Sequence, residues 1–353
     1  MMNNVLRVAC SGTGYFSQFH YEAWNRLENV RLVGVCNRDI EKAKSFSEAY
    51  QIEHYYQHLD EMLLELKPDF LDIITPPVTH LNAVTIAAKL GIDVCCQKPF
   101  GENIEQAQQM VAIAQEAGIK LVIHENFRFM PWIRKAKEVI DSGILGQILN
   151  VQFNLRPGDG QGSNAYLARQ AYFQDMPKFL IHETGIHIVD VFRYFFGEPN
   201  SVYAHLRRCN PVIKGEDAGT VIFQFDGNLQ AILDGNRLLD HNSTNLRRTM
   251  GECQIAGTRG TLNIDGEGRI WFRKIDEQIS NEIHYEWQDE NFGGDCVYQT
   301  IKHIVEHYLQ GSLLENQGVE YLNNILVEQA IYESHEQRSC IDLYLHPSIK
   351  VTP

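Results

Sequence analysis

One lysine stands at the end of a short apolar segment, at a place suited to proton transfer. Residues 92–96 follow Gly91, include β-branched side chains and are too few for a helix, which predicts a buried strand. Pro99 favours an extended backbone at Lys98. Ligands of open α/β sheets bind at the carboxyl ends of the strands, and desolvation lowers a lysine pKa towards neutrality. Lys98 is therefore the first candidate for acid–base catalysis, the alternative being a solvated lysine that merely ends a strand.

A glycine pair predicts a phosphate-binding turn. Gly12 and Gly14 follow a predicted strand at 5–11 and precede an amphipathic segment, with Thr13 between them and Tyr15 and Phe16 after them. In a strand–turn–helix unit, the first glycine permits a tight turn and the second lets the backbone approach a pyrophosphate. Ser17 replaces the third glycine of the pattern and is small enough for close helix–strand packing. A plain strand-to-helix turn is the alternative.

The end of the second predicted strand indicates which nicotinamide cofactor is used. A carboxylate at this position grips the ribose hydroxyls of NAD, but this chain has Asn37 followed by Arg38. The missing acid removes repulsion against a 2′-phosphate, and an arginine could pair with that phosphate. The pattern therefore favours NADP slightly over NAD, since Arg38 could equally lie flat on the adenine.

A histidine and an acid share one face of a later helix, which Gly197 ends. Glu183 and His187 are four residues apart and so project to the same side. His182 and His187 are five apart, or about 140° around a helix, which excludes the zinc-binding His-Glu-x-x-His arrangement. No third ligand accompanies Glu183 and His187, so we expect no metal. A buried, hydrogen-bonded core histidine is the alternative for His187.

A glycine-rich segment at 156–163 precedes a run of polar and aromatic residues. Tyr166, Arg169, Gln170 and Tyr172 belong to this run. Polar and aromatic groups together suit a polyhydroxylated ligand, which predicts a substrate loop over the active site. A solvated surface loop is the alternative.

The order of predicted elements indicates two domains. Strands and helices alternate as far as residue 124, which predicts a doubly wound parallel sheet. Short strands with hairpin turns dominate the part after residue 200, which predicts an antiparallel sheet. The fold class is therefore α/β, with an amino-terminal Rossmann domain at 1–124 and a carboxy-terminal α+β domain at 125–353. The predicted strands are 5–11, 31–36, 70–74, 92–96, 120–124, 147–155, 218–225, 229–234, 254–256, 261–264 and 270–274, and two helices, 297–309 and 319–336, close the chain.

Composition excludes several classes of partner. The 353 residues carry a net charge of −14, which argues against nucleic acid and anionic membranes. No apolar run approaches the roughly 20 residues that span a bilayer, and the amino terminus lacks a signal-peptide pattern. The eight cysteines form no Cys-x-x-Cys pair, so we expect neither a disulfide scaffold nor a structural zinc site. These features predict a cytoplasmic protein.

The chain resembles the Gfo/Idh/MocA oxidoreductases, the glucose-fructose oxidoreductase and inositol dehydrogenase group. The resemblance rests on motifs in the family's order: Gly12-Thr13-Gly14 with His20, residues 72–80, Gln97-Lys98-Pro99, residues 126–129, residues 142–146 and residues 185–190. It implies an open carboxy-terminal sheet that bears the substrate site and an oligomer interface. It also implies two sets of site residues: Thr75, Pro76, Pro77, His80, Gln97, Lys98 and Asn126 at the cofactor, and Arg128, Glu183 and His187 at the substrate. Gln97 departs from the family's usual Glu-Lys-Pro.

The resulting prediction is an NAD(P)-dependent oxidoreductase acting on an unphosphorylated sugar or polyol. Lys98, assisted by His187 and Glu183, would exchange the hydroxyl proton. The leading choice is a sugar 1-dehydrogenase that yields a lactone, in a homodimer or homotetramer. Two alternatives remain: a nicotinamide-dependent glycoside hydrolase of the same family, and a cofactor or sugar sensor without turnover.

Overall fold

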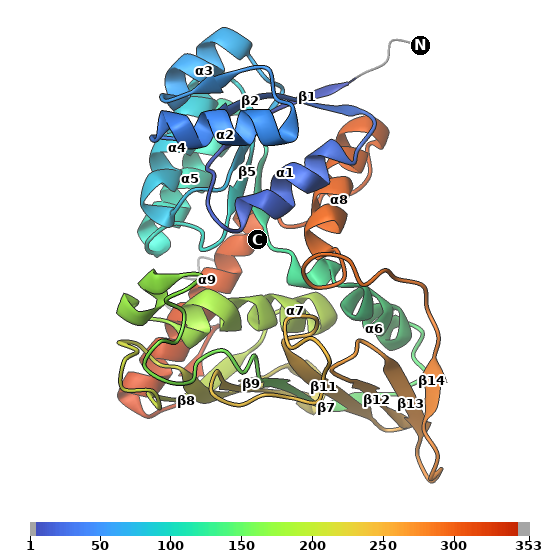
Figure 1. Ribbon diagram of the computed structural model, residues 1–353. Coiled ribbons are helices and arrows are strands. Elements are labelled where there is room, and N and C mark those ends of the chain that lie inside the picture. The colour runs from blue at the N-terminus through green and yellow to red at the C-terminus, as the bar shows by residue number, and fades with distance from the viewer. Residues whose placement is uncertain (1–4, 345–353) are drawn as a thin grey trace. The chain divides into compact units, whose positions relative to one another are not determined.

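The chain folds into two compact units (Figure 1). The computed structural model describes residues 5–344, so residues 1–4, which begin the segment examined for a signal peptide, lie outside it. The first unit comprises the chain up to Asn126 and Val297–Ile325, and the second comprises Phe127–Cys296 and the chain from Leu326. The sequence predicts a single boundary at residue 124, and in the structure Val297–Ile325 also belongs to the first unit.

A parallel six-stranded sheet forms the centre of the first unit. Its order is β3-β2-β1-β4-β5-β6, so the order reverses between β1 and β4. All four residues of β4 and of β6 are buried, as expected for strands covered on both faces. The predicted doubly wound sheet is confirmed, with strands β1 (Leu6–Ser11), β2 (Val30–Cys36), β3 (Tyr55–Tyr56), β4 (Phe70–Ile73), β5 (Asp93–Gln97) and β6 (Leu121–His124).

Helices connect these strands and cover the sheet. Their ends follow local chemistry: the Asn103 side chain accepts from the Gln106 N–H at the start of α5, and Gly118 ends α5 with φ of 70°. The helices are α1 (Ser17–Asn25), α2 (Ile40–Tyr50), α3 (Leu59–Leu66), α4 (His80–Lys89) and α5 (Ile104–Ala117), with the short η1 (Pro77–Thr79) before α4.

Helix α8 (Cys296–Gln310) explains why the chain returns to the first unit. The Tyr308 hydroxyl donates to Asp93 at 2.5 Å, and the Tyr308 ring meets the Phe70 ring edge-on at 5.5 Å. These contacts join α8 to β4 and β5. Helix α9 (Gly318–Gln337) then crosses from the first unit to the second. No helix within residues 5–344 is both long enough and apolar enough to cross a membrane.

A nine-stranded sheet forms the second unit. Its order is β14-β13-β12-β11-β7-β10-β9-β8-β15, and all its neighbours are antiparallel except β7 and β10. Helices α6 (Pro131–Asp141) and α7 (Ile186–Phe196) lie on one face (Figure 1). The predicted open, mostly antiparallel sheet is confirmed, with strands β7 (Ile148–Leu155), β8 (Ser201–Arg207), β9 (Ala218–Gln224), β10 (Gln230–Asn236), β11 (Gly251–Gly257), β12 (Gly260–Ile264), β13 (Ile270–Lys274), β14 (Asn281–Ile283) and β15 (Ile341–Asp342).

Candidate active site

The turn between β1 and α1 has the geometry of a phosphate cradle. Gly12 has φ of +116°, and a Cβ there would lie 2.7 Å from the Ile74 carbonyl oxygen, so only glycine fits. A Cβ on Gly14 would meet no atom of residues 5–344 within 4 Å, which leaves open space beside the backbone. The buried Ser17 hydroxyl donates to the Gly14 carbonyl at 2.6 Å and fixes the turn. This turn therefore fits the pyrophosphate of a dinucleotide.

Asn37 occupies the position expected for ribose recognition, directly after β2. Its Nδ2 donates to the Thr13 hydroxyl at 2.7 Å, and its Oδ1 accepts from the Asp39 N–H at 2.8 Å. Asp39 in turn caps α2 by accepting from the backbone of Glu41. Arg38 is exposed beside it. The phosphate turn and the second strand are thus joined by an amide, with no carboxylate at Asn37.

The segment after β4 is held tightly before α4. The Thr79 hydroxyl lies 2.6 Å from the Thr75 hydroxyl, and His80 Nε2 donates to the Thr75 carbonyl at 2.7 Å. Burial lowers the pKa of His80 to about 4. Pro76 and Pro77 complete the turn, so this side of the predicted cofactor site is rigid and neutral at physiological pH.

Lys98 directly follows β5, as predicted from the sequence. It is partly buried, and its N–H donates to the Gln97 side-chain oxygen at 2.8 Å. Asn126 follows β6 and is 2 % exposed, and its Nδ2 finds no hydrogen-bond partner among the described residues. Because the six strands are parallel, Gly12, Asn37, Thr75, Lys98 and Asn126 all lie at one edge of the sheet, where open α/β sheets bind ligands.

His187 and Arg128 lie in the second unit, on α7 and in η2 (Phe127–Phe129). The His187 ring stacks on the Phe127 ring, with centroids 4.0 Å apart and an interplanar angle of 4°. Arg128 forms a two-pronged ion pair with the buried Asp190, through Nε at 2.8 Å and Nη2 at 2.6 Å. Asp190 therefore anchors Arg128 to α7, and an aromatic ring fixes the plane of His187.

The helix that bears Glu183 begins as a π-helix, which the sequence did not predict. This segment (Leu180–Gly185) precedes α7, and single π-turns often occur at functional sites. His182 Nδ1 lies 2.6 Å from Glu328 of α9. Among residues 5–344 no group of three or more His, Cys, Asp or Glu side chains is arranged to hold a metal ion.

Arg237 organises a cluster of polar side chains in the second unit, although its spacing in the sequence gave no signal. It is 1 % exposed, and its guanidinium donates to Asp159 at 3.1 and 3.2 Å, to the Tyr166 hydroxyl at 2.9 Å and to Glu183 at 3.1 Å. Burial lowers the pKa of Arg237, but the two carboxylates and Tyr166 outweigh burial and raise it above its ordinary value. The arginine network, defined as Arg237, Asp159, Tyr166, Glu183 and Thr184, thus fixes the Glu183 carboxylate.

The glycine-rich loop is attached to this network. The Gly158 N–H donates to Leu239 at 3.0 Å, and the Gly160 N–H donates to Arg237 at 2.9 Å. The loop therefore runs along the connection between β10 and β11, residues 237–250. Tyr166 is buried within the network, whereas Tyr172 is 59 % exposed. Arg169 pairs with Asp159 at 3.1 Å.

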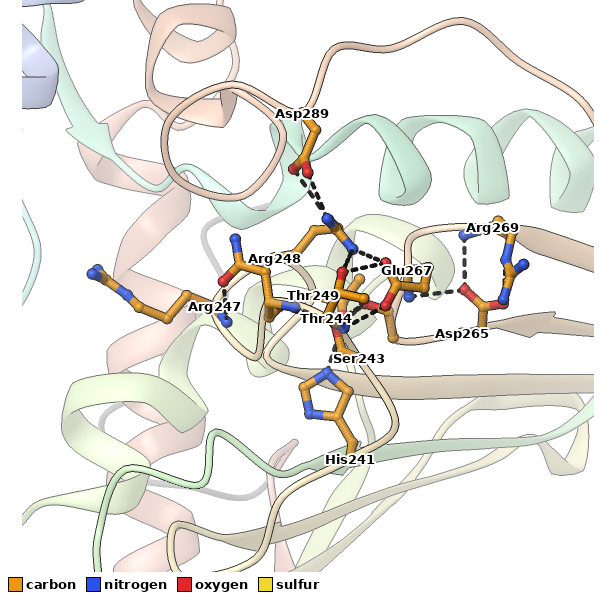
Figure 2. Close-up of polar contacts among 12 residues, drawn as sticks. His241, Ser243, Thr244, Arg247, Arg248, Thr249, Asp265, Glu267, Arg269 and Asp289 are labelled. Carbon is orange, nitrogen blue, oxygen red and sulfur yellow. Dashed lines mark hydrogen bonds and ion pairs between the residues drawn. The ribbon is translucent and has the colours of Figure 1, made fainter.

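A second cluster of charged residues surrounds Arg248, near the end of the connection between β10 and β11 (Figure 2). The nearly buried Arg248 donates to Asp289 at 2.5 and 3.1 Å and also pairs with Glu267. The Thr244 backbone N–H and hydroxyl, together with Arg248, lower the pKa of Glu267. His241 lies 3.2 Å from the Thr249 hydroxyl. These contacts hold residues 241–249, the later part of the connection between β10 and β11.

Two family models match large parts of this chain. The profile described as "Oxidoreductase family, NAD-binding Rossmann fold" matches residues 6–125, and the "GFO/IDH/MocA C-terminal domain" matches residues 133–263. The chain belongs to the Gfo/Idh/MocA family. It is therefore an NAD(P)-dependent oxidoreductase, which confirms the family and the class of enzyme predicted from the sequence.

Several known proteins match almost the full length of this chain, among them two relatives and one solved structure. D-apiose dehydrogenase of Paraburkholderia graminis is 30% identical over 95% of this chain and 89% of its own. D-apiose dehydrogenase of Rhizobium rhizogenes is 26% identical over 96% and 97%. An oxidoreductase from Agrobacterium radiobacter, solved with NAD+, L-tartaric acid and magnesium, is 25% identical, with a TM-score of 0.88 and coverage of 96% and 99%.

Proposed function

We propose that this protein is a sugar or polyol dehydrogenase in which Lys98 exchanges the hydroxyl proton and His187 assists. The observation that carries this proposal is the position of Lys98, directly after β5 at the sheet edge that also bears the phosphate turn. A bound nicotinamide would supply the hydride acceptor or donor. Gly12, Gly14, Asn37 and Thr75 would hold the cofactor, with the amide of Asn126 as a further donor.

The second unit would bind an uncharged, hydroxyl-rich substrate. Its three arginines at the site are each committed to carboxylates: Arg128 to Asp190, Arg169 to Asp159, and Arg237 to both Asp159 and Glu183. Paired guanidinium groups are poor sites for an added phosphate, because the phosphate would have to displace a carboxylate. The similarity to two D-apiose dehydrogenases supports the same class of substrate.

Glu183, His187 and the exposed Tyr172 would contact the substrate, with Arg169 at the rim of the loop and Tyr166 buried in the arginine network. Glu183 is fixed by Arg237 at 3.1 Å and by the Thr184 hydroxyl at 2.5 Å, so it would accept hydrogen bonds from sugar hydroxyls at a defined position. Oxidation at a hemiacetal carbon removes one proton from a relatively acidic hydroxyl. We therefore keep 1-dehydrogenation to a lactone as the leading reaction.

We also propose a slight preference for NADP. Asn37 uses its amide to bridge Thr13 and Asp39, and it brings no negative charge to the ribose. Arg38 is exposed beside it and could pair with a 2′-phosphate. The Agrobacterium structure contains NAD+, so NAD is the competing outcome of a direct comparison.

The decisive test removes the lysine amine. Lys98→Met should lower kcat by about 100-fold or more while cofactor affinity is nearly kept, which is the scale of lost acid–base catalysis. Lys89→Met, on the exposed end of α4, serves as the matched control and should leave kcat unchanged. Near-normal turnover of Lys98→Met would refute the role of the lysine and leave His187 as the candidate.

The substrate is tested with free pentoses, hexoses and inositols, each offered with NAD and with NADP. Reduced-nicotinamide absorbance should rise with unphosphorylated sugars, and the product should be a lactone. A response only to phosphorylated or nonsugar compounds would contradict the substrate class. Release of free sugar from a glycoside without net change in absorbance would instead identify a hydrolase, and tight binding without any turnover would identify a sensor.

The proposal extends to the oligomeric state of the protein and to its cellular compartment. On β8 and β9, every second residue is exposed or partly exposed, so one face of the nine-stranded sheet is uncovered within this chain. We propose that this face joins copies into a dimer or tetramer, which light scattering after size exclusion would test. All eight cysteines are free thiols, which supports a cytoplasmic location.

A further inference from the structure

A buried chain of hydrogen bonds runs beneath Lys98 in the first unit. His20 Nδ1 lies 2.8 Å from Asp72 Oδ2, and His20 Nε2 lies 3.1 Å from Gln97 Nε2. Gln97 Oε1 then accepts from the Lys98 N–H at 2.8 Å. His20 and Asp72 are fully buried, and Gln97 is 8 % exposed. These three side chains therefore connect the interior of the sheet to the backbone of the candidate catalytic lysine.

The Lys98 backbone N–H and the Asp72 carboxylate, at the two ends of this row of hydrogen bonds, determine which group donates in each bond. A backbone N–H can only donate, so the oxygen of Gln97 must face Lys98 and its NH₂ must face His20. His20 Nε2 must then accept, which places the ring proton on Nδ1. From Nδ1 the proton is donated to the Asp72 carboxylate, which also accepts from Trp24 Nε1 at 2.7 Å. One tautomer of His20 satisfies all of these contacts.

A histidine, a tyrosine and three cysteines surround these hydrogen bonds. The titratable groups that face these hydrogen bonds are His124, whose ring centroid lies 4.0 Å from that of His20, the buried Tyr21 and three buried thiols. Burial, and then the Asp72 carboxylate, raise the pKa of Cys10, Cys95 and Cys96 well above the ordinary value, so these thiols remain neutral. Asp72 Oδ1 has no hydrogen-bond partner among residues 5–344. The carboxylate is therefore held through Oδ2 by His20 and Trp24.

We propose that Gln97, His20 and Asp72 act as positioning residues, which hold the backbone of Lys98 through a neutral, Nδ1-protonated His20 selected by the amide of Gln97. The inference rests on the proposed function only for its catalytic consequence, because the tautomer follows from the hydrogen bonds alone. A glutamate at position 97 would present a carboxylate, which could not donate to His20. The same contact would then require both ring nitrogens of His20 to carry protons. The amide of Gln97 thus keeps this contact uncharged.

The ring protons of His20 can be observed without any activity assay. In protein labelled with ¹⁵N-histidine, long-range ¹H–¹⁵N spectra distinguish an Nδ1–H ring, an Nε2–H ring and a doubly protonated ring. We expect His20 to be Nδ1–H at neutral pH, and we expect Gln97→Glu to make it doubly protonated. Gln109→Glu, an exposed change of the same charge on α5, should leave the His20 signal unchanged.

The native spectrum alone can overturn the inference, so it does not depend on the stability of any variant. An Nε2–H or doubly protonated His20 in the native protein would refute it. A His20 signal that is identical in native protein and in folded Gln97→Glu would also refute it. Neutron diffraction from crystals grown of the native protein would locate the same proton and show which histidine gives the signal.

Turnover tests the positioning role. Gln97→Ala removes both side-chain bonds and should lower kcat by up to about 100-fold, the effect of a small misplacement of a catalytic group. Gln97→Glu keeps an acceptor for the Lys98 N–H and should recover most of that loss. Equal turnover in Gln97→Ala and native enzyme would refute positioning. If His20 carries its proton on Nδ1 but Lys98→Met retains turnover, the inference about the tautomer of His20 is supported and the proposed catalytic role of Lys98 is refuted.

Discussion

Replacing Arg237 by methionine should destabilise the second unit. Methionine fills much of the same space but removes five hydrogen bonds, which reach Asp159, Tyr166, Glu183 and Thr184. Asp159 would keep only Arg169 and the Tyr166 hydroxyl as partners, and Glu183 would keep the Thr184 hydroxyl. The change therefore removes the Arg237 guanidinium from two carboxylates.

The expected loss follows from the exposure of these groups. Removing one partner of a fully buried ion pair costs about 3–5 kcal/mol. Arg237 is buried, but the side chains of Asp159 and Glu183 are 23% and 17% exposed, so water recovers part of the loss. We therefore expect a decrease of about 3 kcal/mol in the free energy of unfolding. Arg169→Met removes a 26% exposed partner of Asp159 and should cost less than about 1 kcal/mol.

Urea unfolding, followed by tryptophan fluorescence and by circular dichroism, measures this difference. Arg237→Met should lower the midpoint by about 1 M, and Arg169→Met should shift it much less. Arg237→Lys keeps the charge but offers fewer fixed donors, so it should fall between these two variants. If the free energy of unfolding of Arg237→Met lies within about 1 kcal/mol of that of the native protein, the arginine network contributes little to stability and the reasoning is wrong.

Three further predictions concern the first unit. Gly14→Val should abolish cofactor binding with the fold intact, because its side chain would occupy open space where the pyrophosphate lies; unchanged affinity by calorimetry would contradict this. Asn37→Asp should shift the ratio of kcat/KM towards NAD, since a carboxylate repels a 2′-phosphate; an unmoved ratio would show that Asn37 is not the selector. Burial lowers the pKa of His80 from 6.5 to about 4, so the unfolded chain binds an extra proton between these values. Roughly 3 kcal/mol of stability, present above pH 6.5, should therefore disappear as the pH falls towards 4, and His80→Asn should flatten this loss in urea titrations.

The sequence by itself determined the fold class and one edge of the site. Alternating strands and helices, with apolar runs such as 92–96, can bury both faces only in a parallel sheet. Such a sheet brings the residue after each strand to a common edge, so Gly12, Asn37 and Lys98 could be grouped without coordinates. The return of α8 to the first unit was not predictable in this way, because the Tyr308–Asp93 bond joins residues 215 positions apart.

Only the tertiary structure decided which polar groups meet in the interior. Arg237 follows β10 without any motif, yet strand pairing and the 237–250 connection place it between Asp159 and Glu183. His20 and Gln97 are likewise 77 residues apart and meet because their elements pack on the same sheet edge. Periodicity records which face of an element is buried. It carries no record of which donor finds which acceptor, since that depends on crossings and registers fixed only when the elements pack.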